Sequence, residues 1–317
     1  TTSQSDERNL RVFCRQSYTT RTKKTNYTLL FAPYKVTLPA EHAQVSLVAL
    51  RCGCFSCVLM LNHGRFPPPA RTPLPPHPML LTLDIGNTRA KLVSFLDGRP
   101  RPEAVCAVAE LPAALAQIGA RCPSIEAVHW CSVGADIATV EHMLSRTGWA
   151  SRRLVPAAEV NGVHLDYRTP QTLGADRLAA VLGARCLQPT GHLLVIDAGT
   201  CITFDVLLAD GHYVGGNISP GVDMRLAAMH AHTSRLPHVD ARGELPLLGF
   251  DTPTALRSGV LRGIAFEIEG YVRRLREEYG PITTFLTGGN RSDFPVSAES
   301  CTFADEYLVA RGLATDF

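Results

Sequence analysis

The sequence predicts an α/β protein with two related domains, each built on a mixed sheet, that face a common cleft. First, an apolar strand, an acid, a glycine-containing turn and a second extended stretch occur in this order twice, around residues 84–88 and 197–200. Second, extended apolar stretches alternate with helical patterns from Met79 onward, as they do in α/β domains. Third, 317 residues with 45% hydrophobic content are enough for two hydrophobic cores.

The first half opens with a hairpin whose strands flank the first turn, and it ends with a helix that leads into the second half. The intervening pattern alternates between strands, helices and one long loop. In chain order the expected elements are strands 80–83 and 90–96, helix 112–118, strand 127–133, helix 137–146, loop 160–172 and helix 175–186.

The second half repeats this plan. Its expected elements are strands 193–196 and 202–208, a loop at 215–221, helices 222–231 and 252–278, and strand 283–286. In the longest helix, Leu256, Val260 and Ile264 recur every four residues and mark one buried face.

The two acidic turns have the residues that phosphoryl transfer from a nucleotide requires. Glycine allows the backbone amides to approach a phosphate, and the carboxylates of Asp84 and Asp197 suit a metal ion that bridges phosphates. Asn87, Thr88 and Thr200 add side-chain hydrogen bonds, and residues 287–289 offer a third backbone approach on the adenosine side. Neither the P-loop pattern nor the Rossmann glycine pattern is present in the sequence.

Residues 167–177 form a third cluster, with Tyr167, two arginines and Asp176 ahead of an apolar helix. Taken alone, Asp176 and Arg177 are an ordinary first-turn acid and a surface base. Beside two phosphate turns, a catalytic base with an anion-binding arginine is the better explanation.

Composition excludes several other classes. The net charge is +2 with both signs intermixed, which argues against nucleic acid as a partner, and no apolar run is long enough to span a membrane. Irregularly spaced cysteines suit a reducing cytoplasm. Cys52, Cys54 and Cys57 could hold zinc only with His63, so no metal is expected there, and the remaining histidines, including His212, His230 and His232, are interpreted as structural or surface residues.

Residues 1–78 differ from the rest of the chain and end in a proline-rich stretch. They are either a flexible extension or the result of an upstream choice of start site, with Met79 as the true start. The second interpretation is favoured because the segment lacks the pattern of a signal peptide. The expected domains are therefore 79–187 and 188–317, after this leader.

Six motifs occur in a fixed order: Asp-x-Gly-Asn-Thr, Tyr-x-Thr-Pro, Leu-Gly-x-Asp-Arg, Asp-x-Gly-Thr, Gly-Gly-x-Ile-x-Pro-Gly and Thr-Gly-Gly. From Met79 to about Leu313 the chain resembles the type III pantothenate kinases, which include proteins named Bvg accessory factor. The resemblance implies the two-domain actin-like, Hsp70 and sugar kinase fold, which is ribonuclease H-like. It also implies that the protein is an ATP-dependent kinase that converts pantothenate to 4′-phosphopantothenate, in the first step of coenzyme A biosynthesis, and that it is a homodimer.

The resemblance also implies roles for individual residues. Asp176 would be the proton acceptor. ATP would be bound by Asp84, Ile85, Gly86, Asn87, Thr88, Arg89, Ala90, Lys91 and Thr200, with magnesium near Asp84. Pantothenate would be bound by Tyr167, Gly174, Ala175, Asp176, Arg177 and Thr252, the last from the second domain or from a partner subunit. Asp197 would bind a monovalent cation, potassium or ammonium, where the residues alone suggest magnesium.

Two alternatives remain open at this point. One is a nucleotide-binding accessory factor that regulates transcription, although such a regulator would not need a base beside an anion site. The other is a kinase of the same fold with a sugar acceptor, which the cluster at residues 167–177 disfavours. Two small departures from the family pattern, Cys201 and Gly134, affect no predicted site residue.

Overall fold

The structure, a computed structural model, describes residues 79–290, 294–297 and 299–317, together with four short strands nearer the N-terminus. The chain divides into two compact units, residues 1–74 and 75–317. In the first unit, two antiparallel pairs form: β1 (Tyr18–Thr19) with β4 (Ser46–Leu47), and β2 (Tyr27–Phe31) with β3 (Tyr34–Leu38). The predictions about the cysteine trio and about the origin of residues 1–78 lie outside the described residues.

The first lobe of the larger unit is built on a five-stranded sheet of order β7-β6-β5-β8-β9. Its first three strands are antiparallel neighbours, and β8 and β9 then add in parallel. The strands are β5 (Met79–Ile85), β6 (Arg89–Leu96), β7 (Arg99–Ala107), β8 (Ile125–Ser132) and β9 (Ala150–Arg153).

The second lobe repeats this topology. The order β14-β13-β12-β15-β16 again places the first strand in the centre, two antiparallel strands on one side and two parallel strands on the other. The repeated strands are β12 (His192–Ala198), β13 (Cys201–Leu207), β14 (His212–Pro220), β15 (Ile282–Thr287) and β16 (Phe303–Ala304). The predicted duplication is therefore confirmed, and β10 (Glu159–Val160) and β11 (Val163–Leu165) extend the second sheet beyond β14.

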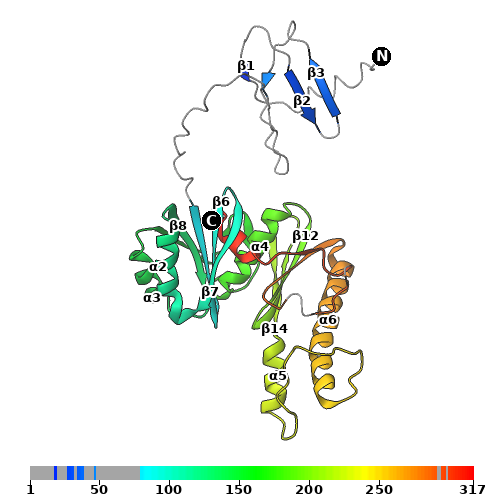
Figure 1. Ribbon diagram of the computed structural model, residues 1–317. Helices are drawn as coiled ribbons and strands as arrows, with labels where there is room; N and C mark the ends of the chain where they lie inside the picture. The colour runs from blue at the N-terminus through cyan, green and yellow to red at the C-terminus, as the bar shows by residue number, and fades with distance from the viewer. Residues whose placement is uncertain are drawn as a thin grey trace, which may run out of the picture. The chain divides into compact units, whose positions relative to one another are not determined.

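Some helices pack between the two sheets and others cover their outer faces (Figure 1). Apolar side chains of α2 (Leu111–Arg121) and α3 (Ile137–Ser145) pack on the first sheet. Helices α4 (Ala175–Leu187) and α7 (Leu308–Leu313) share a core with the inner face of the second sheet, and Ala310 of α7 also packs on β6 of the first. Helices α5 (Val222–Ala231) and α6 (Thr252–Tyr279) cover the other face of the second sheet.

Two expectations about loops are wrong. The expected loop at 215–221 is mostly strand β14, whose pairing with β13 is irregular next to Val206. The expected loop at 160–172 contains β11, which pairs in parallel with β14.

Strand β7 was not expected, because Pro100 and Pro102 interrupt any strand pattern. Proline is tolerated on an edge strand, where one side of the backbone has no partner, and β7 lies at the edge of its sheet with a register irregularity opposite Leu92.

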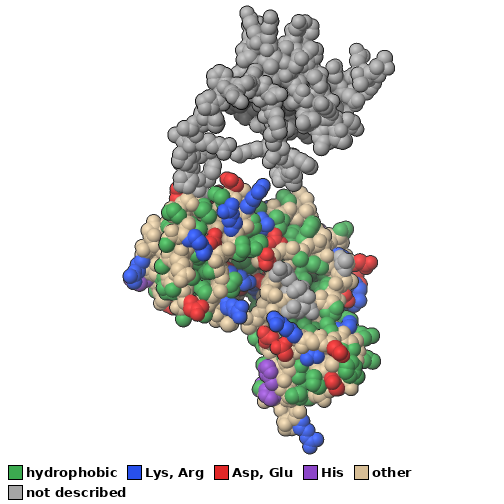
Figure 2. All heavy atoms as spheres, in the orientation of Figure 1, with side chains coloured by type: hydrophobic (Ala, Val, Ile, Leu, Met, Phe, Trp, Pro, Cys, Tyr) green, Lys and Arg blue, Asp and Glu red, His purple; other side chains and the backbone are tan. Residues whose placement is uncertain are grey.

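The distribution of surface charge and the character of the helices agree with the expectations from composition. Figure 2 shows Lys and Arg side chains intermixed with Asp and Glu on the visible face, without a basic stripe. Within the described residues, no helix is long and apolar enough to cross a membrane.

Candidate active site

Three carboxylates from separate elements meet at one place. Asp84 and Asp197 are each the sixth of seven residues in the first strand of their sheet, and Asp176 lies in the first turn of α4. The pKa of Asp84 is raised to about 6, mainly by burial; Lys91 opposes this shift and the nearby charge of Asp176 adds to it. Burial likewise raises the pKa of Asp197 to about 6, with Asp84 and Asp176 adding to the effect. Since the charge of Asp176 acts on both Asp84 and Asp197, and that of Asp84 acts on Asp197, the three converge from both lobes on a shared region.

Lys91 is the cation of this cluster. It is the cross-strand partner of Asp84 on β6, and its charge acts on all three carboxylates. No ion pair shorter than 4 Å joins Lys91 to them in the described part of the chain. Three acids therefore face one exposed base, and the region carries an excess of negative charge.

Asp176 has the position and environment of a general base. Its carboxylate is half-buried, and its Oδ1 accepts a hydrogen bond of 2.8 Å from the Arg177 amide. Burial raises the pKa of Asp176, and the Arg177 amide and guanidinium partly offset this rise. A carboxylate with a raised pKa takes up a proton more readily than a solvated one does.

The two turns present unpaired backbone amides next to these acids. The Gly86 amide donates to the Arg89 carbonyl at 3.0 Å, and the Gly199 amide donates to Cys201 at 2.9 Å. In the described part of the chain, the amides of Asn87, Thr88 and Thr200 donate to no protein acceptor. Amides arranged in this way can bind phosphate oxygens.

A glycine from a neighbouring segment packs on each turn. A Cβ at Gly134 would lie 2.7 Å from both the Gly86 carbonyl oxygen and the Asn87 Cα. A Cβ at Gly221 would overlap the carbonyl oxygens of Gly199 and Thr200. The expectation that the departure at Gly134 affects no site residue is therefore wrong, because this glycine packs directly on two predicted ATP residues, Gly86 and Asn87.

The other predicted ATP residues differ in what they can contribute. The side chains of Ile85 and Ala90 are fully buried in the core of the first lobe, so only their backbone is available to a ligand. Arg89 and Lys91 are exposed. Sequence reasoning missed Cys131, whose Sγ lies 3.6 Å from Asp84 Oδ1, because this contact depends on the register between β5 and β8.

The predicted acceptor residues are brought together, except for one. Gly174 and Ala175 directly precede Asp176 and Arg177 at the start of α4, and Tyr167 packs against the core beneath this helix. Thr252 is exposed at the first position of α6, and among the described residues no hydrogen bond or ion pair joins it to α4. The Arg177 guanidinium is buried against Asp205, a residue that no motif had indicated.

A cavity of about 1060 Å³ lies beside residues 287–289, the segment predicted to approach the adenosine side of the nucleotide. It is lined by Gly289 and Asn290, by the start of α5 at Val222 and Asp223, and by residues 238–243. The Asn290 amide donates to the Ala198 carbonyl at 3.1 Å, which ties this segment to the strand that carries Asp197. The sequence did not predict that residues 238–243 line this cavity, because the segment contains no motif and no helix or strand.

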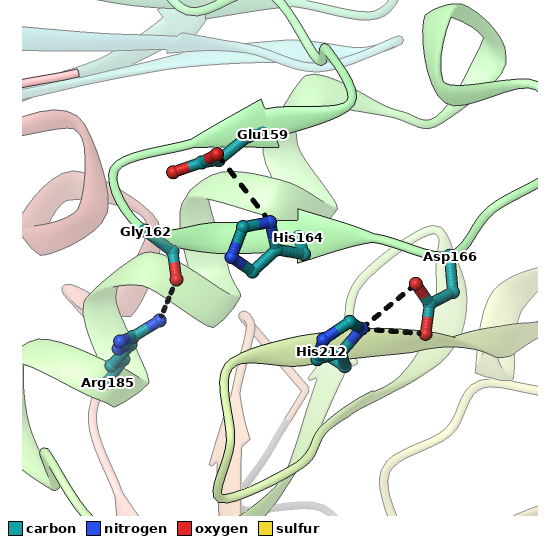
Figure 3. Close-up of polar contacts among 6 residues, drawn as sticks. All are labelled: Glu159, Gly162, His164, Asp166, Arg185 and His212. Carbon is teal, nitrogen blue, oxygen red and sulfur yellow. Dashed lines mark hydrogen bonds and ion pairs between the residues drawn. The ribbon is translucent and has the colours of Figure 1, made fainter.

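The histidines make other contacts. Figure 3 shows His212 facing Asp166 and His164 facing Glu159 near the edge of the second sheet, and Nδ1 of His212 lies 3.1 Å from Asp166 Oδ1. The hydrogen bond to Asp166 raises the pKa of His212. Among the described residues, no group of three or more His, Cys, Asp or Glu side chains is arranged to hold a metal ion by itself.

The acids nevertheless fit a cation that is held jointly with a phosphorylated ligand. Magnesium is commonly bound by one or two carboxylates together with substrate phosphates, and oxygen is its preferred ligand. Asp84 and Asp197 supply two carboxylates that could each hold a cation next to bound phosphates, and their negative charge is only partly balanced by Lys91.

Comparison with known proteins gives one consistent family. The family model described as type III pantothenate kinase matches residues 80–274. A type III pantothenate kinase of Phocaeicola vulgatus is 43% identical over 235 residues, which cover 74% of this chain and 96% of the relative. One from Bacteroides fragilis is 41% identical over 241 residues, with the same coverage of 74% and 96%. Among solved structures, the chain is similar to a ROK hexokinase from Thermus thermophilus, with a TM-score of 0.43 and 16% identity over 74% of this chain and 96% of that one.

Proposed function

The chain belongs to the type III pantothenate kinase family, and on this basis we propose that it transfers the γ-phosphoryl group of ATP to the primary hydroxyl of pantothenate. The product is 4′-phosphopantothenate, and the reaction is the first step of coenzyme A biosynthesis. The observation that carries the proposal is the convergence of Asp84, Asp176 and Asp197, which have the residue types and placement that phosphoryl transfer to an alcohol requires.

Asp176 is the proposed catalytic base. Its carboxylate accepts the proton of the pantothenate hydroxyl while the oxygen attacks the γ-phosphorus, and the bond to the β–γ bridging oxygen breaks. The hydrogen bond from the Arg177 amide fixes one carboxylate oxygen and leaves the other for the hydroxyl. Because such reactions depend mainly on positioning and on charge stabilisation, the rigid first turn of α4 suits this role.

The two turns hold the phosphates in this proposal. The amides of Asn87, Thr88 and Thr200 point donors at the phosphate oxygens, and Lys91 adds a positive charge. When bound, a divalent cation would neutralise the charge that develops on the phosphates. Asp84 would hold that magnesium ion together with the nucleotide, and Asp197 would hold a monovalent cation, potassium or ammonium.

The cavity beside Gly289 and Asn290 is the proposed site of the adenosine. Asn290 lines this cavity, and its amide is hydrogen-bonded to Ala198, the residue after Asp197. A nucleotide whose phosphates lie at the turns could therefore place its base in the cavity. Two carboxylates on the cavity wall, Asp223 at the start of α5 and Asp240, are acceptors of the kind that binds a ribose hydroxyl.

A second copy of the chain is the proposed partner. Four large apolar side chains are exposed on α6 and on the segment before it: Leu247 (67%), Leu248 (83%), Phe250 (70%) and Phe266 (58%). Arg262 and Ser258 bind the carbonyl of Pro246, which fixes this segment on the helix. Such a patch is typical of an interface, and it lies next to Thr252, the predicted substrate residue that α4 does not reach.

The test is a coupled assay with ATP, pantothenate and magnesium, run in potassium and again in sodium. We expect turnover of pantothenate with the wild type, faster in potassium, and a loss of at least about a thousandfold in kcat with Asp176→Asn. Nucleotide binding should persist in this variant. Phosphate transfer to a sugar but not to pantothenate would overturn the substrate, and undiminished turnover by Asp176→Asn would overturn the assigned base.

A further inference from the structure

A buried polar cluster lies under the acceptor site, beyond the residues assigned above. The Arg177 Nη2 lies 2.8 Å from Asp205 Oδ1, and Arg177 Nε donates to the same oxygen at 3.0 Å. The Tyr213 hydroxyl donates to Asp205 Oδ1 at 2.7 Å and accepts from Arg177 Nη2 at 3.2 Å. Arg177 is 6% exposed, and both Asp205 and Tyr213 are fully buried.

The cluster connects α4 to two strands of the second sheet. Asp205 lies within β13, Tyr213 lies on the adjacent strand β14, and Arg177 follows the proposed base in the first turn of α4. Through these bonds, the end of the helix that carries Asp176 is held against the sheet at a fixed point.

Gly216 leaves the space that the guanidinium occupies. It is the cross-strand partner of Asp205, and a Cβ at this position would overlap the Phe204 carbonyl oxygen. The same Cβ would lie 2.6 Å from Arg177 Nη2 and 2.9 Å from Asp205 Oδ1. One glycine of the Gly-Gly-x-Ile motif thus serves the cluster, since any side chain there would displace the arginine.

One end of the guanidinium remains available to a ligand. The two arginine donors used are Nε and Nη2, and among the described residues Nη1 makes no hydrogen bond. Because the buried side-chain atoms without a partner do not include Nη1, this nitrogen keeps some exposed surface although Arg177 as a whole is buried. Tyr167, a predicted substrate residue, lies close by, with its ring centroid 6.2 Å from that of Tyr213.

Stability alone is a poor explanation for this arrangement. Desolvating a buried ion pair offsets most of its attraction, and apolar residues of similar volume often stabilise a protein equally well. Two partners that restrain a single guanidinium instead fix the direction of its remaining donors, which is the requirement for recognising a carboxylate.

We propose that Asp205 and Tyr213 are positioning residues that orient Arg177 so that its Nη1 binds the carboxylate of pantothenate, at a fixed distance from the base that receives the hydroxyl proton. This inference rests on the proposed function. Neither positioning residue touches the substrate; both act through Arg177.

The test compares pantothenate with its alcohol analogue, in which a CH₂OH group replaces the carboxylate, at saturating ATP. Tyr213→Phe removes one hydroxyl and keeps the ion pair, so we expect the KM for pantothenate to rise about tenfold while kcat and the KM for ATP stay near wild-type values. The alcohol analogue should give the same kcat/KM with the variant as with the wild type. Asp205→Asn should lower kcat/KM for pantothenate by about a hundredfold.

Tyr271→Phe is the matched control, because it also removes a tyrosine hydroxyl but does so on the other face of β13. The Tyr271 ring packs in that core on Phe204, with the two ring centroids 4.3 Å apart. It should leave both acceptors unaffected. If Asp205→Asn fails to fold, Tyr213→Phe alone decides the result. An unchanged KM for pantothenate, or equal losses with both acceptors, would overturn the positioning role; a wild type that leaves pantothenate unphosphorylated would overturn the proposed function and this inference with it.

Discussion

Replacing Asp84 by asparagine should stabilise the ligand-free protein while it removes kinase activity. Burial raises the pKa of Asp84 from its ordinary value of 3.8 to about 6, so the folded state holds an unfavourable charge at neutral pH. One pKa unit corresponds to about 1.4 kcal/mol, which makes the folded-state penalty about 3 kcal/mol as an upper figure. For a unit of this size, that energy corresponds to a rise in Tm of about 6–12 °C at most.

The sign of the pH dependence follows from proton binding. Between about pH 4 and pH 6, the folded wild type retains a proton on Asp84 that the unfolded chain has released, so wild-type stability falls as the pH rises through this window. Below this window the carboxyl is neutral in both states, and the asparagine variant should lose its advantage. The stabilisation is therefore expected at pH 7.5 and should largely disappear at pH 4.

Urea denaturation followed by far-UV circular dichroism, without nucleotide or divalent cations, measures the free energy of unfolding at both pH values. Asp136→Asn is the control, because Asp136 caps α3 by accepting hydrogen bonds from the Thr139 hydroxyl at 2.7 Å and from the Thr139 amide at 2.9 Å, and these two bonds lower its pKa. That replacement should give no gain at either pH. An Asp84→Asn protein that is no more stable than the wild type at pH 7.5, or that keeps its full advantage at pH 4, would refute the reasoning.

Two further predictions concern the nucleotide turn and the apolar patch. Gly134→Ala should raise the KM for ATP about tenfold, because its Cβ would displace the turn at Gly86. Gly259→Ala is the control and should leave this KM unchanged, because the space around its Cβ is open. Equal KM values for the two variants would contradict the packing argument. Leu248→Asp should convert a dimer into monomers in light-scattering measurements, because it places a charge in the patch, and a mass unchanged by this substitution would place the interface elsewhere.

The features that could be predicted from the sequence are those that short local patterns specify. Each acidic turn is defined by a few consecutive residues, and the apolar period of α6 predicted a helix at 252–278 where the structure has Thr252–Tyr279. Because both turns follow the first strand of their halves, recognising them also predicted the duplicated topology.

The features that could not be predicted depend on pairing between distant segments. Strand β7 was missed because an edge position, which permits Pro100 and Pro102, is a property of the whole sheet. Asp205 was missed for a similar reason, since it occurs in an apolar strand with no motif and meets Arg177 only when α4 packs on the second sheet. The sequence indicated Arg177 as an anion-binding residue but not that its charge is already paired.

This pairing has a consequence for the charge of the whole site. With Arg177 largely matched by Asp205, the carboxylates of Asp84, Asp176 and Asp197 are opposed in the described part of the chain mainly by Lys91. A triphosphate adds several more negative charges, and backbone amides supply only partial positive charge in return. A site with this balance can accept ATP only together with cations that offset the excess. The divalent cation that the family's reaction uses with ATP, and the monovalent cation proposed beside Asp197, both agree with how the chain distributes its own charges between the acceptor pocket and the phosphate turns.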